Sequence, residues 1–128
     1  MAEASYPDDL LYHPEHDWAR IDGEEAVFGI TCYAQDSMGE VVFFDPPKVG
    51  AQVSKDSPYT EVESVKAVSD VISPLSGEVI AVNDDLSDSP ETINEDPYGE
   101  GWLVRVKLSD PSEAEALLDS AGYQATLS

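Results

Sequence analysis

The lysines are the residues of this chain best suited to carry a chemical group, because an ε-amine can be acylated. There are four of them: Lys48, Lys55, Lys66 and Lys107. Most surface lysines are only solvated cations, so a functional one has to stand out by its position. Lys66 does so, because it follows one alternating segment, 59–64, and precedes another, 67–72. This pattern predicts a hairpin with Val65-Lys66 at its tip.

A lysine at the tip of a rigid hairpin is well placed for modification. The strands on both sides would hold its amine away from the body of the protein and present it to a modifying enzyme. Acylation would remove the charge and leave the flexible four-carbon stem as a tether. Pro74 and Gly77 mark a second turn, so the whole hairpin region spans 59–82. Lys66 is therefore the candidate for covalent attachment of a carried group.

Other nucleophilic or metal-binding side chains are few. The chain has one cysteine, Cys32, and two histidines, His13 and His16. As zinc ligands, their number and spacing match no established site. A Cys32–His nucleophile pair would make the chain an enzyme, but no nucleophile elbow, P-loop or dinucleotide-binding motif accompanies it. We therefore expect neither catalytic residues nor a metal, and unchanged function after Cys32→Ala would argue against an enzyme.

The charge balance limits the classes of partner. Six basic residues stand against 27 acidic ones, which gives a formal net charge of −21. Such a chain lacks the basic stripe that displaces counterions from nucleic acid, and anionic membrane surfaces would repel it. The surplus of carboxylates favours solubility, as in a salt-rich cytoplasm, and also docking onto enzymes whose active-site mouths are positively charged. The composition leaves both explanations open.

Several features predict a cytoplasmic protein. A single cysteine excludes an internal disulfide and fits a reducing compartment. No apolar stretch approaches the roughly 20 residues needed to span a bilayer. Segment 1–9 has neither the cationic flank nor the apolar core of a targeting signal. The alternative is that a transit peptide is missing from this sequence.

Short segments of β character, separated by turn residues, predict a mostly β protein. Asp22-Gly23 suits the tight turn of the first hairpin. Thr31 can cap a short helix that runs to Met38 and ends at Gly39. The expected strands are 18–21, 26–30, 41–44, 49–53, 59–64, 67–72, 78–82 and 102–108.

The end of the chain has a helical pattern instead. Asp110 can be an N-cap and Glu113 can complete a capping box. Together with Gly122 as a stop, they predict a helix over about 111–120. The preceding loop, 87–101, is long, irregular and rich in proline and glycine, as binding loops often are.

The octapeptide from Glu63 to Asp70, ESVKAVSD, closely resembles the lipoylation motif of glycine cleavage H proteins. The similarity covers essentially the whole chain, as a series of blocks in the family's order. These are HDW at 16–18, GIT at 29–31 with AQ at 34–35, GEVVF at 39–43, PLSGEV at 74–79 with VN at 82–83, IN, DPYG and GWL between 93 and 103, and LLD at 117–119 with Tyr123. Several spaced blocks in the right order make the resemblance specific.

The resemblance implies a fold and a cofactor. The fold would be mostly β, a hybrid barrel-sandwich of two antiparallel sheets with short peripheral helices and a C-terminal helix. It would form a single lipoyl-carrier domain over 1–128. The cofactor would be lipoate, attached covalently to Lys66. Biotinyl carriers are the nearest competitors, but they flank their lysine with methionines, whereas Lys66 lies between Val65 and Ala67.

The resemblance also implies a role in glycine catabolism in which the chain itself catalyses nothing. The lipoyl group would take the aminomethyl group of glycine from glycine decarboxylase, a pyridoxal-phosphate enzyme. It would pass this group to aminomethyltransferase, which uses tetrahydrofolate, and dihydrolipoyl dehydrogenase, a flavin enzyme, would reoxidise it. A lipoate ligase or lipoyltransferase would load the chain. The alternative is a lipoyl relay protein that donates lipoate to other complexes, and gene neighbourhood would distinguish the two.

The resemblance further places Asp17, Tyr33 and Asp70 near a surface cleft into which the loaded arm can fold. Three residues depart from the family pattern. Asp17 stands where Glu is common, which shortens a carboxylate of that cleft. Cys32 stands where Asp is usual. Asp56 stands where Gly is usual, which suggests a different turn at this point.

Overall fold

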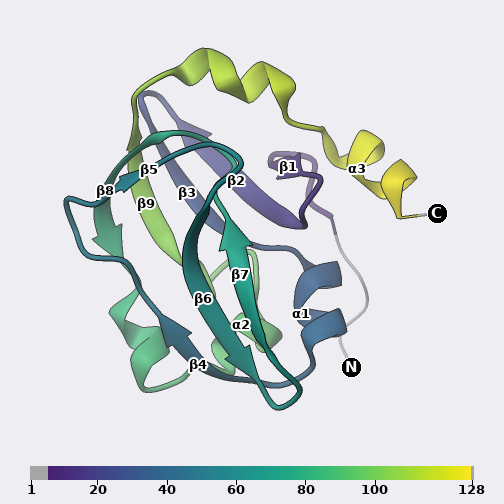
Figure 1. The fold of residues 1–128 in the computed structure, drawn as a ribbon. Helices are drawn as coiled ribbons and strands as arrows, with labels where there is room; N and C mark the ends of the chain where they lie inside the picture. Colours follow the sequence, from purple (N-terminus) through teal and green to yellow (C-terminus); the bar gives the residue numbers. More distant parts are fainter. Residues whose placement is uncertain (1–5, 128) are drawn as a thin grey trace.

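The computed structural model describes residues 6–127, so residues 1–5 of the segment expected to carry no targeting signal lie outside the described residues. The described strands form two antiparallel sheets that lie one in front of the other (Figure 1). The six-stranded sheet contains, in spatial order, β1 (Leu11–His13), β2 (Asp17–Asp22), β3 (Glu25–Ile30), β9 (Val104–Leu108), β8 (Gly77–Val82) and β5 (Gln52–Val53). The three-stranded sheet contains β4 (Val41–Asp45), β6 (Pro58–Ser64) and β7 (Val68–Ile72). The prediction of a mostly β fold with two antiparallel sheets is confirmed.

The main core lies between the two sheets. Successive side chains of a strand point to opposite faces, so each strand sends about every second residue inward. Phe28, Val79 and Val106 from the six-stranded sheet meet Phe44 and Val62 from the other, and all five are at most 1% exposed. Burying a large apolar side chain of this kind stabilises the fold by about 1.5–3 kcal/mol.

A second, aromatic cluster covers part of the six-stranded sheet. It contains Leu10, Tyr12, Trp18 and Tyr123, all at most 1% exposed. The rings of Tyr12 and Tyr123 stack with their centroids 4.9 Å apart. Trp18 packs so closely over Gly29 that a Cβ there would lie 2.5 Å from the indole ring, so this position requires glycine.

Helix α1 (Cys32–Met38) forms as the sequence predicts. The Thr31 side chain accepts a hydrogen bond from the Ala34 N–H, which satisfies one of the free donors of the first turn. Gly39 ends the helix with a φ of 80°, a left-handed conformation that glycine adopts without strain. The segment after the helix leads directly into β4.

The prediction of one helix over 111–120 is wrong. The chain forms a 3₁₀ helix, η2 (Pro111–Ala116), and then a separate helix, α3 (Ser120–Thr126). Between them, Leu118 exchanges backbone hydrogen bonds of 2.7 and 2.8 Å with Tyr12. This long-range pairing overrides the local helical pattern, and Asp119 then caps the new helix by accepting from the Gly122 N–H. Gly122 therefore lies inside α3 instead of ending a helix.

Glu113 is not part of a capping box. Its carboxylate accepts hydrogen bonds from the Ser76 N–H at 2.8 Å and the Ser76 hydroxyl at 2.9 Å. The side chain thus ties η2 to the turn before β8.

The loop 87–101 is less irregular than the sequence suggests. It follows a 3₁₀ helix, η1 (Asp84–Ser87), and contains a short helix, α2 (Thr92–Glu95). Leu86 and Ile93 anchor these turns in the core, at 1% and 0% exposure. The predicted strand 49–53 is shortened to β5, because Lys48 to Ala51 form a turn with a hydrogen bond of 3.0 Å. In residues 6–127, no helix has the length and apolar character needed to cross a membrane.

Candidate modification site at the β6–β7 hairpin

The β6–β7 hairpin has the predicted tip, Val65-Lys66, and Figure 1 shows it projecting at the lower edge of the molecule. Glu63 pairs with Val68 at the end of the ladder. The Ser64 N–H then donates to the Ala67 carbonyl at 2.8 Å and closes the turn. The Ser64 hydroxyl donates to the same carbonyl at 3.2 Å and accepts from the N–H groups of Lys66 and Ala67, both at 3.3 Å.

Ser64 is a residue whose role the sequence analysis missed. A serine hydroxyl often accepts a hydrogen bond from the backbone N–H group two residues later in a turn. The position of Ser64 in the motif therefore already indicated this role. Its hydroxyl binds three backbone groups of the turn and thereby holds the backbone at Lys66 in one conformation.

The four lysines differ in their surroundings. Lys66 is exposed at the tip, and within residues 6–127 its ammonium forms no ion pair. Lys55 is half-buried, with its amine 3.1 Å from the Asp56 carboxylate. Lys107 lies within β9, paired in register with Glu25 and Glu78. Lys48 is exposed in the loop between β4 and β5. Of the four, Lys66 alone lies at the tip of a strand–strand hairpin.

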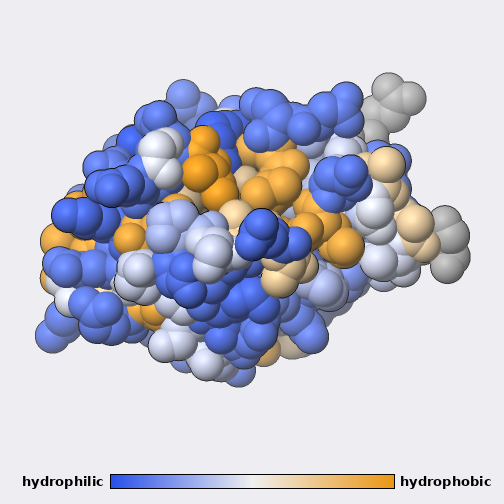
Figure 2. Space-filling model, turned by 90° about the horizontal axis from the view of Figure 1, so that it is seen from above, coloured by the Kyte–Doolittle hydropathy of each residue, from blue (hydrophilic) through white to orange (hydrophobic). Residues whose placement is uncertain are grey.

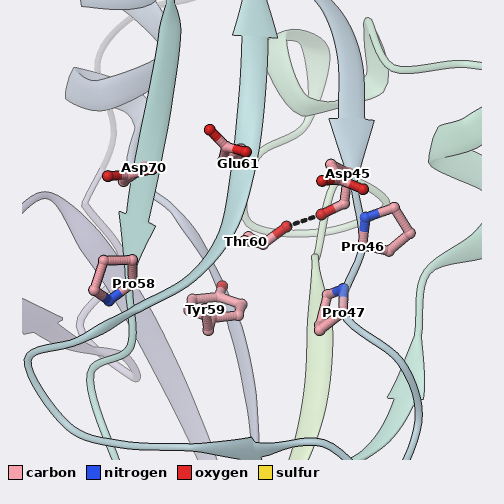
Figure 3. A pocket seen from close by; sticks show the side chains of 8 residues that line it. All are labelled: Asp45, Pro46, Pro47, Pro58, Tyr59, Thr60, Glu61 and Asp70. Atoms are coloured by element: carbon pink, nitrogen blue, oxygen red, sulfur yellow. Dashed lines mark hydrogen bonds between the residues drawn. The ribbon is translucent and has the colours of Figure 1, made fainter.

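The outer face of the three-stranded sheet is acidic. Asp45, Glu61 and Asp70 are in register on neighbouring strands, and they line a pocket of about 530 Å³ (Figure 3). Glu63 is exposed on β6, two residues closer to the hairpin tip than Glu61, and it lines a second hollow of about 260 Å³. Like charges directly opposite one another destabilise a sheet. We name the surface formed by these four carboxylates the acidic face.

Apolar side chains accompany the acidic face. A register shift between Val41 and Phe43 marks a bulge in β4, and it leaves Val42 and Phe43 each 49% exposed. Val65 and Val68, which flank the tip, are 63% and 54% exposed. We name these four exposed apolar side chains, on β4 and in the β6–β7 hairpin that carries Lys66, the apolar rim. Figure 2 shows a further apolar patch, surrounded by mostly hydrophilic residues, on the face seen from above.

Comparison with a family model and with related proteins identifies the family of the chain that carries this hairpin. The model of the glycine cleavage H-protein matches residues 10–128. A glycine cleavage system H protein of Anaeromyxobacter sp. (strain K) is 54% identical over 119 residues, covering 93% of each chain. That of Myxococcus xanthus (strain DK1622) is 50% identical over 121 residues, covering 94% of each chain. The chain belongs to the glycine cleavage H-protein family.

A solved structure agrees with this assignment. The crystal structure of a glycine cleavage system H protein from Mycobacterium marinum matches with a TM-score of 0.86 and 38% identity, covering 94% of this chain and 98% of that one. The function of the chain is thus that of a lipoyl carrier in the glycine cleavage system, which passes the aminomethyl group of glycine between enzymes.

Asp17, the first of the three expected cleft residues, is buried in this H-protein family member. It is 1% exposed, and no residue in 6–127 hydrogen-bonds to either carboxylate oxygen. Nδ1 of the His13 ring lies 3.8 Å from one of these oxygens. Burial raises the pKa of the Asp17 carboxyl well above its usual range, which favours the neutral form.

Tyr33 and Asp70 lie on different elements, α1 and β7. Tyr33 on α1 is 41% exposed, with its ring 4.6 Å from that of His16, the neighbour of Asp17. Asp70 is exposed on β7, in a pocket whose lining includes neither Asp17 nor Tyr33. Tyr59 also lines that pocket. Burial, followed by the charge of Asp17, raises the pKa of the Tyr59 hydroxyl well above its usual range.

Asp56 does not require a different turn. Its φ of 71° lies in the left-handed region that favours glycine, and aspartate tolerates this region better than most residues. Its carboxylate accepts from His13 Nε2 at 2.6 Å, and this bond and a second from Lys55 lower the pKa of Asp56. His13 Nδ1 accepts from the Glu15 N–H at 3.0 Å, so Nε2 carries the proton that is donated.

Cys32 lies at the first position of α1 and is 7% exposed. In the described range, 6–127, Gln35 Nε2 approaches its Sγ at 3.8 Å, whereas His13 and His16 bond to Asp56 and to Tyr123. The geometry therefore pairs neither imidazole with this thiol. The same range contains no cluster of three or more His, Cys, Asp and Glu side chains able to hold a metal ion.

Proposed function

We propose that Lys66 is the residue to which lipoate is attached in this carrier. The observation that supports this is the position of its amine, exposed at the tip of a turn that Ser64 holds fixed. The deprotonated amine would attack the acyl carbon of lipoyl adenylate. An amide C–N bond forms, the acyl C–O bond to the phosphate breaks, AMP leaves and the amine gives up one proton. The surroundings fit the product, because the neutral arm can lie along the apolar rim.

Mass spectrometry tests this attachment directly. The protein is incubated with a lipoate–protein ligase, ATP and free lipoate, and its intact mass is measured. We expect the gain of one lipoyl amide, and peptide mapping should place it on Lys66. The matched controls are Lys66→Arg and Lys48→Arg, since both remove an exposed amine. A modification found on Lys48, Lys55 or Lys107, or one that survives Lys66→Arg, would overturn the assignment.

The partners that we propose are glycine decarboxylase, aminomethyltransferase and dihydrolipoyl dehydrogenase. Once attached, lipoate supplies a disulfide that can accept a one-carbon unit and two electrons. The chain itself contributes reach, a high effective concentration at each enzyme and a docking surface. The acidic face next to the hairpin is complementary to positively charged active-site mouths. We propose that the chain is not catalytic, and carbon dioxide release from glycine by the isolated protein would contradict this.

We also propose that the loaded arm folds back toward Asp70. This carboxylate lines the 530 Å³ pocket on the same sheet as the hairpin, where it could pair with a protonated amine of the cargo. Tyr33 is accessible as well, whereas Asp17 would first have to become exposed. Asp70→Ala should leave lipoylation intact and accelerate loss of the cargo as formaldehyde and ammonia. Equal rates of loss in both proteins would show that Asp70 does not protect it.

The compartment that we propose is the cytoplasm. The two relatives named above are bacterial proteins, and the single Cys32 fits a reducing environment. Fractionation of the native cells, followed by detection of lipoylated protein, tests this placement.

A further inference from the structure

The tip of the hairpin is joined to the rest of the protein through the segment between α1 and β4. The Val65 N–H donates to the Glu40 carbonyl at 3.0 Å. The Lys66 side chain also passes over this segment, because a Cβ on Gly39 would lie 3.5 Å from Lys66 Cε. The direction in which the lysine leaves the surface therefore depends on where residues 39–41 are held.

One side chain holds that segment on both sides of Glu40. Asn94 Nδ2 donates to the Gly39 carbonyl at 2.8 Å, and Asn94 Oδ1 accepts from the Val41 N–H at 2.8 Å. The second Nδ2 hydrogen is directed to Gln35 Oε1 at 3.0 Å. Since one partner is a carbonyl and another an N–H, the orientation of the amide group is fixed by the bonds themselves.

Asn94 is in turn fixed by the core. It belongs to α2, where its N–H donates to the Glu91 carbonyl at 3.0 Å, and its neighbour Ile93 is 0% exposed. A continuous chain of hydrogen bonds thus runs from α2 through Asn94 and Glu40 to Val65. No other side chain in residues 6–127 hydrogen-bonds to the backbone of both Gly39 and Val41.

We propose that Asn94 is a positioning residue for Lys66, which sets the orientation in which a modifying enzyme meets the amine. This inference rests on the proposed attachment of lipoate to Lys66. Within residues 6–127 the Asn94 side chain hydrogen-bonds to Gln35, Gly39 and Val41 and not to Lys66, so it would act on the lysine through residues 39–41. A misplacement of a reacting group by about 1 Å can lower a rate by up to about a hundredfold.

The chain offers a matched control for the test. Asn83 also uses its Nδ2 for two hydrogen bonds, to the carbonyls of Glu100 and Trp102, both at 2.8 Å. Asn94→Asp and Asn83→Asp therefore each remove two donated bonds with almost no change of shape. Only the first substitution affects the support of the hairpin.

The experiment compares lipoylation of the two variants by a lipoate–protein ligase with ATP and lipoate. We expect kcat to fall about tenfold for Asn94→Asp and less than about twofold for Asn83→Asp, with KM changed by less than about twofold in both. Hydrogen exchange of the Val65 amide should accelerate at least about tenfold in Asn94→Asp alone. Asn94→Ala, which removes all three bonds without adding a charge, is the second variant if Asn94→Asp does not fold.

The outcomes separate this inference from the proposed attachment. Equal kcat and equal Val65 exchange in the Asn94 and Asn83 variants would overturn the positioning role. Lipoylation of the wild type at another lysine would instead overturn the attachment site. Lowered stability of Asn94→Asp and Asn94→Ala with an unchanged kcat in the folded protein would show a purely structural role for Asn94 and would also overturn the positioning role.

Discussion

The two sheets of this H-protein family member use their outer faces in opposite ways. The six-stranded sheet is covered by an aromatic cluster in which Tyr12, Trp18 and Tyr123 are fully buried. The outer face of the three-stranded sheet is open and carries Asp45, Glu61 and other carboxylates. The six-stranded sheet is therefore apolar on its inner face and partly covered on its outer face, whereas the three-stranded sheet combines an apolar inner face with an open, charged outer face. The lysine lies on the second sheet, where partners can reach it.

The largest expected difference is in stability. Phe28→Ala removes a fully buried ring from between the sheets and should lower the free energy of unfolding by about 3–5 kcal/mol. Phe43→Ala removes the same group from the open face, where it is 49% exposed, and should cost less than about 1 kcal/mol. Denaturant titrations of both variants test this. Similar losses would mean that the open face is also a structural interface.

Asp17 should make stability depend on pH. Its pKa is raised in the folded state, so the folded protein holds this proton at pH values where the unfolded chain has lost it. The contribution of Asp17 to the free energy of unfolding is therefore fully present below the usual carboxyl pKa range. It is lost as the pH rises from that range through the raised pKa of the folded state. Asp17→Asn should remove this dependence and raise the melting temperature more at pH 7 than at pH 4. An equal change at both pH values would contradict the raised pKa.

Neutralising the acidic face should separate docking from folding. Asp45→Asn combined with Asp70→Asn removes like charges on either side of Glu61, which should stabilise the fold by about 0.2–1 kcal/mol. The same change should raise KM for aminomethyltransferase and weaken the dependence of KM on salt. Steady-state kinetics at low and high salt provide the measurement. An unchanged KM would place the docking surface elsewhere.

Asp56 should have the smallest effect. Hydrogen bonds from His13 and Lys55 lower the pKa of Asp56. Its contribution to the free energy of unfolding is therefore present above the usual carboxyl pKa range and is lost as the pH falls through the lowered pKa. Because its side chain is 61% exposed, Asp56→Asn should cost at most about 1 kcal/mol at pH 7. Thermal unfolding at pH 7 and pH 3 tests both the size and the sign.

Local patterns in the sequence predicted much of the open sheet. The β6–β7 hairpin and its tip followed from alternation on both sides of Val65-Lys66. Helix α1 followed from Thr31 as a cap and Gly39 as a stop. Both signals lie within a few residues of the structure that they specify, so no knowledge of the rest of the fold was needed.

Long-range contacts explain what could not be predicted. The pairing of Leu118 with Tyr12 divides the expected C-terminal helix into two. The support of residues 39–41 comes from Asn94, more than fifty positions later in the chain. Such partners leave no periodic signal in a single sequence.

The central claim, that this chain acts by carrying lipoate on Lys66, is tested most directly in a reconstituted glycine cleavage system. Lipoate-treated wild type, Lys48→Arg and Lys66→Arg are each added to the three partner enzymes with glycine, tetrahydrofolate and NAD⁺, and NADH formation is followed. We predict equal rates for wild type and Lys48→Arg, and no NADH above background for Lys66→Arg, although its stability should change by only about 0.5 kcal/mol. NADH formation by folded Lys66→Arg at the wild-type rate would contradict the account.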